Sequence, residues 1–179
     1  MYDFIYQRAD SVDDAAAKVE GADDAMLMAG GMTLLPTLKQ RLAQPSDVVD
    51  LSGISGLAGI SVEGDKVVVG AMTTHATVAA SADIKSKIPA LADLADGIGD
   101  PQVRNRGTIG GSIANNDPAA DYPSACVGLG ATIVTNQREI AADDFFTGLF
   151  ETALDDGEVV TAVKFPIPSK AAYMKFPNP

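Results

Sequence analysis

The chain has 179 residues, 46% of them hydrophobic and 21% charged, which fits one globular domain or two small lobes. Its net charge of −11 argues against a nucleic-acid surface, which needs a basic stripe, and no apolar run is long enough for a membrane span. A single cysteine, Cys126, excludes an internal disulfide and cannot alone hold an iron–sulfur cluster or a structural zinc. We therefore expect any redox centre to be an organic cofactor and, since no signal-peptide pattern is present, a cytoplasmic location.

The first part of the chain predicts a small α/β unit. Ser11, with Asp14 three residues later, is a plausible cap for an Ala-rich helix. The expected elements are a strand at residues 4–6, a helix ending near residue 19, a strand at 25–29, a helix at 34–42 and a strand at 48–51. We expect a first lobe over residues 1–54 and a second over residues 55–179.

The second part predicts a larger α/β unit. Its expected elements are a hairpin of residues 59–62 and 66–70, helices at 75–80, 88–95 and 123–129, a hairpin of 131–135 and 138–141, and a strand at 159–165. The aromatic patch at residues 145–150 is expected in the core, and the acidic run at 155–158 is expected as a solvated turn. Residues 173–176 are expected to begin one more strand.

Two glycine-rich stretches carry the most chemical information. The first is Ala29-Gly30-Gly31-Met32-Thr33, in an expected strand-to-helix turn, and the second contains Gly107, Gly110 and Gly111. Glycine permits positive φ and close approach of a ligand, so consecutive N–H groups can converge on an anion, and a helix N-terminus adds partial positive charge. We expect a diphosphate held largely by backbone donors, with hydroxyls from Thr33, Thr108 and Ser112. The alternative is that these glycines only form turns or bends.

Other polar residues allow two interpretations each. Asp121 is a candidate acceptor for a ribose or ribityl hydroxyl, or a cap of the following helix. Arg104 and Arg106 are candidate phosphate partners, or ties to a nearby acid. His75 is the only histidine and is expected to be a hydrogen-bonded structural residue, and Cys126 a buried, inert one. We predict no catalytic side chain, no metal site and neither a P-loop nor a G-x-G-x-x-G motif.

Three motifs together resemble a known family. They are Ala29-Gly30-Gly31 with Thr33-Leu34, GAMTTH at residues 70–75 and RNRGTIGG at residues 104–111. This combination is similar to the FAD-binding medium subunit of molybdenum hydroxylases, most of all that of aerobic carbon monoxide dehydrogenase and more distantly the flavin domain of xanthine dehydrogenase. The resemblance covers essentially the whole chain. It implies an α+β, two-lobed FAD-binding fold of the vanillyl-alcohol-oxidase (PCMH) type, with FAD between the lobes.

The resemblance also implies which residues contact FAD. The family's contacts fall on Leu27, Met28, Ala29, Gly30, Gly31, Met32, Thr33 and Leu34, on Thr108, Ile109, Gly110, Gly111 and Ser112, and on Ile98, Asp121, Val160 and Lys175. Where carbon monoxide dehydrogenases commonly have A-G-G-H-S, this chain has Met32 and Thr33, so the hydroxyl is kept and the imidazole is lost. Ser112, where the xanthine type has Asn, favours the carbon monoxide dehydrogenase branch.

The function implied by the resemblance is that of an oxidoreductase subunit in electron transfer. Substrate would be oxidised at a molybdenum cofactor on a large subunit, and electrons would pass through [2Fe–2S] clusters on a small subunit to FAD here and on to an external acceptor. Family members continue beyond residues 175–179 into a C-terminal domain that this chain lacks, so we expect weaker FAD binding. Two alternatives remain: a self-contained flavin oxidoreductase of the same fold, and a non-catalytic nucleotide-binding or assembly module.

Overall fold

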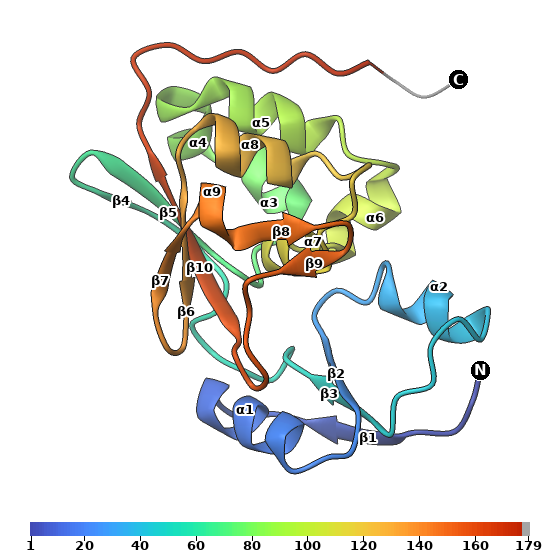
Figure 1. The fold of residues 1–179 in the computed structure, drawn as a ribbon. Helices are drawn as coiled ribbons and strands as arrows, with labels where there is room; N and C mark the ends of the chain where they lie inside the picture. The colour runs from blue at the N-terminus through green and yellow to red at the C-terminus, as the bar shows by residue number, and fades with distance from the viewer. Residues whose placement is uncertain (177–179) are drawn as a thin grey trace.

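The computed structural model describes residues 1–176 and shows an α+β architecture (Figure 1). The first part consists of β1 (Ile5–Arg8), α1 (Val12–Glu20), β2 (Ala25–Met28), α2 (Leu34–Lys39) and β3 (Asp47–Asp50). The second part consists of β4 (Ile60–Glu63), β5 (Lys66–Gly70), α3 (His75–Ala80), α4 (Ala82–Lys87), α5 (Pro89–Asp96), α6 (Pro101–Arg106), α7 (Ile109–Asn115), α8 (Tyr122–Gly128), β6 (Thr132–Thr135), β7 (Glu139–Ala141), α9 (Ala142–Phe145), β8 (Phe146–Gly148), β9 (Glu151–Thr152) and β10 (Val160–Pro166). The predicted α+β class is confirmed.

The first sheet is parallel, with strand order β1-β3-β2. Every residue of its central strand β3 is buried, as expected for a parallel strand covered on both faces. Helix α1 packs on one face through Ala15 against Val49 and its neighbours, and it begins where predicted, because the Ser11 hydroxyl accepts a hydrogen bond from Asp14 N.

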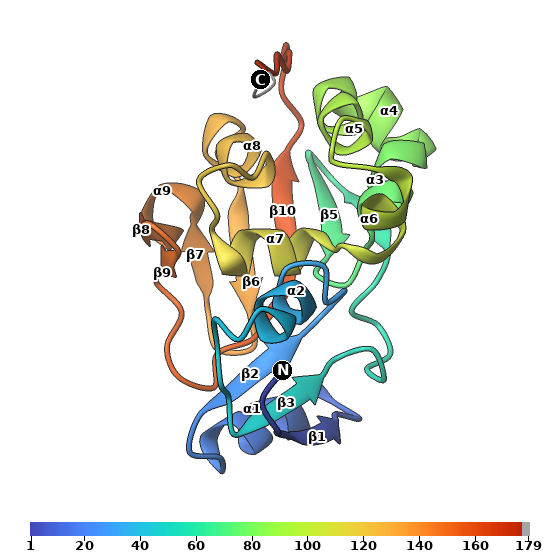
Figure 2. The same cartoon turned by 90° about the vertical axis from the view of Figure 1, so that its right-hand side faces the viewer.

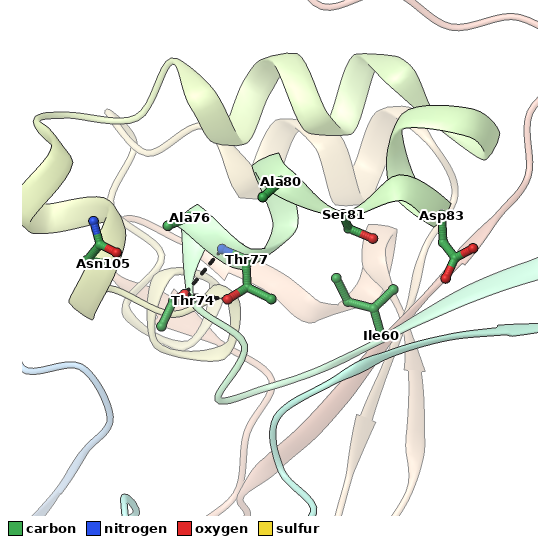
Figure 3. A pocket seen from close by; sticks show the side chains of 8 residues that line it. All are labelled: Ile60, Thr74, Ala76, Thr77, Ala80, Ser81, Asp83 and Asn105. Carbon is green, nitrogen blue, oxygen red and sulfur yellow. Dashed lines mark hydrogen bonds between the residues drawn. The ribbon is translucent and has the colours of Figure 1, made fainter.

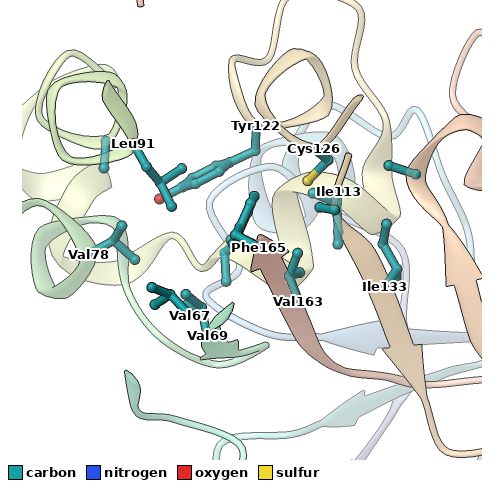
Figure 4. Close-up of a cluster of buried hydrophobic side chains, with 14 of the residues drawn as sticks. Val67, Val69, Val78, Leu91, Ile113, Tyr122, Cys126, Ile133, Val163 and Phe165 are labelled. Carbon is teal, nitrogen blue, oxygen red and sulfur yellow. The ribbon is translucent and has the colours of Figure 1, made fainter. Parts of the chain in front are cut away.

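The second sheet is antiparallel, with strand order β4-β5-β10-β6-β7. Its central strand β10 alternates buried positions such as Val163 and Phe165, and these meet helices on one face in the main hydrophobic core (Figure 4). Tyr122 of α8 is among the largest fully buried side chains of this core. Figure 2 shows α7 crossing in front of this sheet, next to the connection between β2 and α2.

The segment around the second glycine stretch is more helical than predicted. Asp100 caps α6 by accepting from Val103 N, and Thr108 caps α7 by accepting from Gly111 N. The two glycines of α7 lower its intrinsic helix propensity, and α6 has only six residues, so the apolar spacing of the sequence indicated neither helix. Helix α4 was also missed, and α2 is shorter than predicted because Arg41 takes a left-handed φ of 60°.

Three further predictions are wrong or only partly right. In the aromatic patch, Phe145 is buried, but Leu149 and Phe150 are 68% and 56% exposed at the tip of the β8–β9 hairpin. In the acidic run, Glu158 is buried instead of solvated. Residues 173–176 form no strand with any other described residue. The sequence analysis placed the boundary to the family's C-terminal domain at residues 175–179, and the last three of these lie outside the described residues.

In the sequence, the strands of the first sheet precede the connection from β3 to β4, and those of the second sheet follow it. This connection contains the predicted boundary at residue 54. We keep the division into lobes of residues 1–54 and 55–179 as a proposal. Among the described helices, none has the length and apolar character needed to cross a membrane.

Candidate functional site

The two glycine stretches meet in space. A Cβ built on Gly30 would lie 1.9 Å from the carbonyl oxygen of Arg106, and one built on Gly111 would lie 3.4 Å from Cβ of Ala29. The β2–α2 connection and the start of α7 are also adjacent in Figure 2. The fold thus brings together segments that are some 75 residues apart in the sequence.

The first stretch presents free backbone donors. Within residues 1–176, none of the six consecutive N–H groups of residues 29–34 donates a hydrogen bond to the protein. Gly31 has a φ of +72°, a left-handed conformation of the kind with which successive amides can turn toward one side and bind an anion. Thr33 is exposed, and its hydroxyl makes no hydrogen bond to another described residue. This stretch has the donors that a diphosphate requires.

The second stretch does not present such donors. The amides of Ile109 and Gly110 donate to the carbonyls of Thr73 and Ala71, at 3.1 and 2.9 Å, and the amide of Gly111 donates to the Thr108 hydroxyl at 3.2 Å. The expectation that consecutive amides of this stretch converge on an anion is therefore wrong for these three residues. Their N–H groups already donate hydrogen bonds within the protein and are not free for a ligand.

The glycines of the second stretch also serve a different purpose from the expected one. None of Gly107, Gly110 and Gly111 has a positive φ. A Cβ would instead lie 2.6 Å from Nε2 of His75 at Gly107, and 2.6 Å from Cβ of Ala71 at Gly110. These positions need glycine because neighbouring atoms leave no room for a side chain.

Asp121 forms the centre of a second group of predicted residues. Its carboxylate does not cap α8, so that alternative is wrong. One carboxylate oxygen accepts a hydrogen bond from the Tyr173 hydroxyl, and the other lies 2.9 Å from Nζ of Lys175. Lys175 Nζ also donates to the Gly97 carbonyl at 3.3 Å, next to Ile98. The structure thus brings Ile98, Asp121 and Lys175 together.

The remaining predicted residues lie at the edges of the site. Val160 is buried at the start of β10. The carbonyl of its neighbour Thr161 accepts a hydrogen bond from the amide of Ala71, and the carbonyl of Ala71 accepts one from the amide of Gly110. The strand therefore lies beneath the second stretch. Leu27 packs in the core formed with α1, so its side chain has a structural role there, whereas Ser112 has a hydroxyl without a hydrogen-bond partner in residues 1–176.

A buried His–Tyr pair adjoins the second stretch and was not predicted. The rings of His75 and Tyr122 are 5.3 Å apart, and their atoms Nδ1 and Oη are buried without a partner in the described residues. The expectation that His75 is hydrogen-bonded is therefore wrong. Burial lowers its pKa to about 4, although the negative charge of Asp121 opposes this shift. Tyr122 lacked any sequence signal beyond its place after Asp121.

Two of the other predictions have clear outcomes. Cys126 is fully buried, and burial raises its thiol pKa to about 12, which confirms an inert residue. Arg104 donates to the carbonyls of Ile98 and Gly99, both at 3.1 Å, so it fastens a turn and contacts no acid there. Arg106 is exposed and forms no ion pair within the described part of the chain.

A hollow of about 500 Å³ lies elsewhere, beside α3 (Figure 3). Its lining residues are Ile60, Thr74, Ala76, Thr77, Ala80, Ser81, Asp83 and Asn105. It contains none of the residues predicted to bind a cofactor and only one charged side chain. Across residues 1–176, no cluster of three or more His, Cys, Asp or Glu residues is placed to hold a metal ion.

Comparison of the structure with solved proteins defines its class. It superposes with a TM-score of 0.90 on a carbon monoxide dehydrogenase chain from Hydrogenophaga pseudoflava, at 41% identity over 93% of this chain and 60% of that one. A chain of quinoline 2-oxidoreductase from Pseudomonas putida 86 also gives a TM-score of 0.90, at 36% identity and the same coverage. The fold is that of the FAD-binding chains of molybdenum hydroxylases.

The sequence gives the same answer. Residues 2–168 match the family described as the FAD binding domain in molybdopterin dehydrogenase, and the chain belongs to this family. It is 41% identical to the carbon monoxide dehydrogenase medium chain of H. pseudoflava and 39% identical to the nicotine 6-hydroxylase medium subunit of Paenarthrobacter nicotinovorans. It spans 58% of the length of each of these relatives.

Proposed function

We propose that this chain binds FAD and is the flavin-carrying subunit of a carbon monoxide dehydrogenase-like molybdenum hydroxylase. The observation that carries this proposal is the run of unpartnered amides at residues 29–34, placed by Gly30 against the second glycine stretch. Six adjacent donors without a protein acceptor in residues 1–176 are available to a ligand, and the diphosphate is the part of FAD that accepts such hydrogen bonds. The residues present therefore fit the cofactor of the family.

The structure supports different roles for the two stretches in this proposal. Residues 29–34 supply the backbone donors, and Thr33 adds a hydroxyl from the exposed side of the turn. The second stretch, Thr108 to Ser112, forms the wall against which the first turn rests, and Ser112 provides a free hydroxyl. Asp121 and Lys175 supply a carboxylate and an ammonium group next to Ile98. Val160 lies at the start of β10, which is linked to the second stretch through hydrogen bonds of Ala71.

In this proposal the chain carries electrons and performs no acid–base chemistry. Bound FAD supplies two-electron and one-electron redox chemistry, and the protein supplies position and electrostatics. The partners would be a large subunit with the molybdenum cofactor and a small subunit with [2Fe–2S] clusters, and an external acceptor would receive the electrons. The substrate of the complex would be set outside this chain. The expected cytoplasmic location remains part of the proposal.

The proposal is tested by FAD titration of the purified protein, followed by absorption spectra after desalting. Thr33→Val removes one exposed hydroxyl and no protein hydrogen bond, so we expect normal folding and about tenfold weaker FAD binding. Thr147→Val removes an equally exposed and unpartnered hydroxyl on β8 and serves as the matched control, with unchanged affinity. A folded protein that rejects FAD would contradict the proposal and favour an assembly module.

A second readout separates the electron-transfer role from that of a self-contained flavoenzyme. The FAD-loaded chain is mixed with small reductants of the types that the relatives' names suggest, without any partner subunit, and flavin bleaching is followed. Since this proposal gives no side chain of the chain a role in acid–base chemistry, we expect no rapid reduction. Fast bleaching by a small organic substrate would favour the self-contained flavoenzyme instead.

A further inference from the structure

The last described residues of the chain form a segment that contacts the rest of the protein through Tyr173 and Lys175. After β10, residues 169–176, here called the strap, run without regular structure over the side of the molecule that carries α5 and α8 (Figures 1 and 2). Seven of these eight residues are exposed, and only Tyr173 is partly buried. Its neighbours Met174 and Phe176 are 93% and 96% exposed. Apolar packing of the strap therefore rests on Tyr173.

Tyr173 makes two kinds of contact. Its ring packs against the main hydrophobic core, and its hydroxyl donates to Asp121. The other oxygen of the Asp121 carboxylate pairs with Lys175, two residues further along the strap. Within residues 1–176, the other contact of the Lys175 ammonium group is a 3.3 Å hydrogen bond to the Gly97 carbonyl, so we infer that its place at the site depends on where Tyr173 fixes the strap.

We propose that Tyr173 is a positioning residue that latches the strap onto Asp121 and thereby places Lys175 at the candidate cofactor site. An extended segment without backbone hydrogen bonds gains little to offset the entropy of ordering it. Among the described contacts of the strap, Tyr173 is the one that adds burial in the core to a hydrogen bond, while Lys175 is held through its exposed ammonium group. A hydrogen bond to a carboxylate is stronger than one between neutral groups. The last step, delivery of Lys175 to FAD, rests on the proposed function, whereas the latch does not.

The latch itself is tested without any cofactor. Trypsin cuts after Lys170 in the strap faster when the segment leaves the surface and can enter the protease site, so a change in the cutting rate reports a change in the population of the open form. We expect Tyr173→Phe, which keeps the ring and loses the hydroxyl, to be cut about tenfold faster than the wild type, and Tyr173→Ala faster still. Tyr2→Phe removes a hydroxyl that has no hydrogen bond in the described structure and is the control. Equal cutting rates for Tyr173→Ala and the wild type would overturn the latch.

The delivery of Lys175 is tested by FAD binding in a double-mutant cycle. If Tyr173 acts through Lys175, Tyr173→Phe weakens FAD binding in the wild type and has little further effect once Lys175→Ala is present. Lys170→Ala removes an exposed strap lysine and is expected to leave affinity unchanged. Additive effects of the two substitutions would contradict positioning, even with a confirmed latch. If the wild type binds no FAD, the proposed function and the delivery step both fail, and the trypsin result alone decides the latch.

Discussion

Gly30 rests directly on the backbone of Arg106. A Cβ at Gly30 would lie 1.9 Å from the carbonyl oxygen and 2.6 Å from the carbonyl carbon of Arg106, which is too close for a Cβ and an atom that is not bonded to it. The two glycine stretches of the candidate site thus meet backbone to backbone, and this contact fixes the distance between the free amides of residues 29–34 and the start of α7. In the proposed diphosphate site, the two stretches can approach this closely because Gly30 has no side chain.

Gly30→Ala is expected to destabilise the protein even without a ligand. The opposing atoms belong to the backbone and cannot rotate away, so the loops must separate, at a cost of about 2 to 3 kcal/mol. Urea unfolding of the cofactor-free variant measures this cost. Gly128→Ala, at the end of α8 where a Cβ would meet no atom within 4 Å, is the matched control, and we expect it to be stabilised by about 0.5 kcal/mol. A Gly30→Ala protein as stable as the wild type would show that the loops do not touch.

Glu158 is expected to contribute much more to stability than its position in an acidic run indicates. Its buried carboxylate accepts from Arg138 Nε at 2.9 Å and Nη2 at 2.8 Å, and from the Thr135 hydroxyl at 2.7 Å. The hydrogen bonds from Arg138 hold the pKa of Glu158 at about 2, against the effect of burial. We expect Glu158→Gln to cost about 2 kcal/mol at neutral pH, measured by urea unfolding, because the buried side chain loses the charge that pairs with the partly exposed Arg138.

The same residue predicts a pH dependence. The carboxyl of Glu158 protonates at about pH 2 in the folded chain and near its usual value of 4.5 in the unfolded chain, so its contribution is complete above pH 4.5 and is lost as the pH falls toward 2. The loss of stability over this window should be smaller in Glu158→Gln. Glu139→Gln, which breaks the exposed pair with Lys164, is the control, and we expect little change. If the two substitutions changed the pH dependence of stability equally, this would argue against a special contribution of the buried Glu158 carboxylate.

His75 is expected to stay neutral far below the usual pH. As the only histidine, it gives one imidazole signal in an NMR titration, and this signal should move near pH 4 instead of 6.5. Because the unfolded chain protonates first, stability from this group is complete above pH 6.5 and falls as the pH drops toward 4. Asp121→Asn removes the charge that raises the pKa, so the midpoint should fall further. A midpoint near 6.5 would mean that the ring is not buried.

Asn116 is expected to hold the β8–β9 hairpin to the end of α7. It has a left-handed φ of 44° and donates from Nδ2 to the carbonyls of Gly148 and Glu151, both at 2.8 Å. Asn116→Ala loses both bonds and strains the backbone, so we expect a loss of about 2 to 3 kcal/mol in urea unfolding. Asn116→Gly removes only the bonds and should lose less. Asn115→Ala, one residue earlier, is the control, and an equal loss there would argue against this role.

Much of the fold followed from local sequence patterns. The Ser11 cap, the apolar run of β3 and the hairpin of β4 and β5 lie close to their predicted positions, because each depends on neighbouring residues alone. The family also followed from short motifs, and residues 2–168 match it. The patterns missed the short helices α4, α6, α7 and α9 and the strands β8 and β9. The ends of such short elements depend on caps and packing more than on apolar spacing.

The candidate site itself was decided by tertiary structure. The sequence by itself determined which residue types are available: the residues indicated two glycine stretches and Asp121 as candidates for a nucleotide site, and the family resemblance added Lys175. Only the fold decided that the free amides belong to residues 29–34, that Gly107 and Gly110 are small because His75 and Ala71 crowd them, and that Tyr173 holds Asp121. The physical reason is that a residue type states which bonds a group can make, whereas contacts between distant segments decide which of these bonds remain free for a ligand.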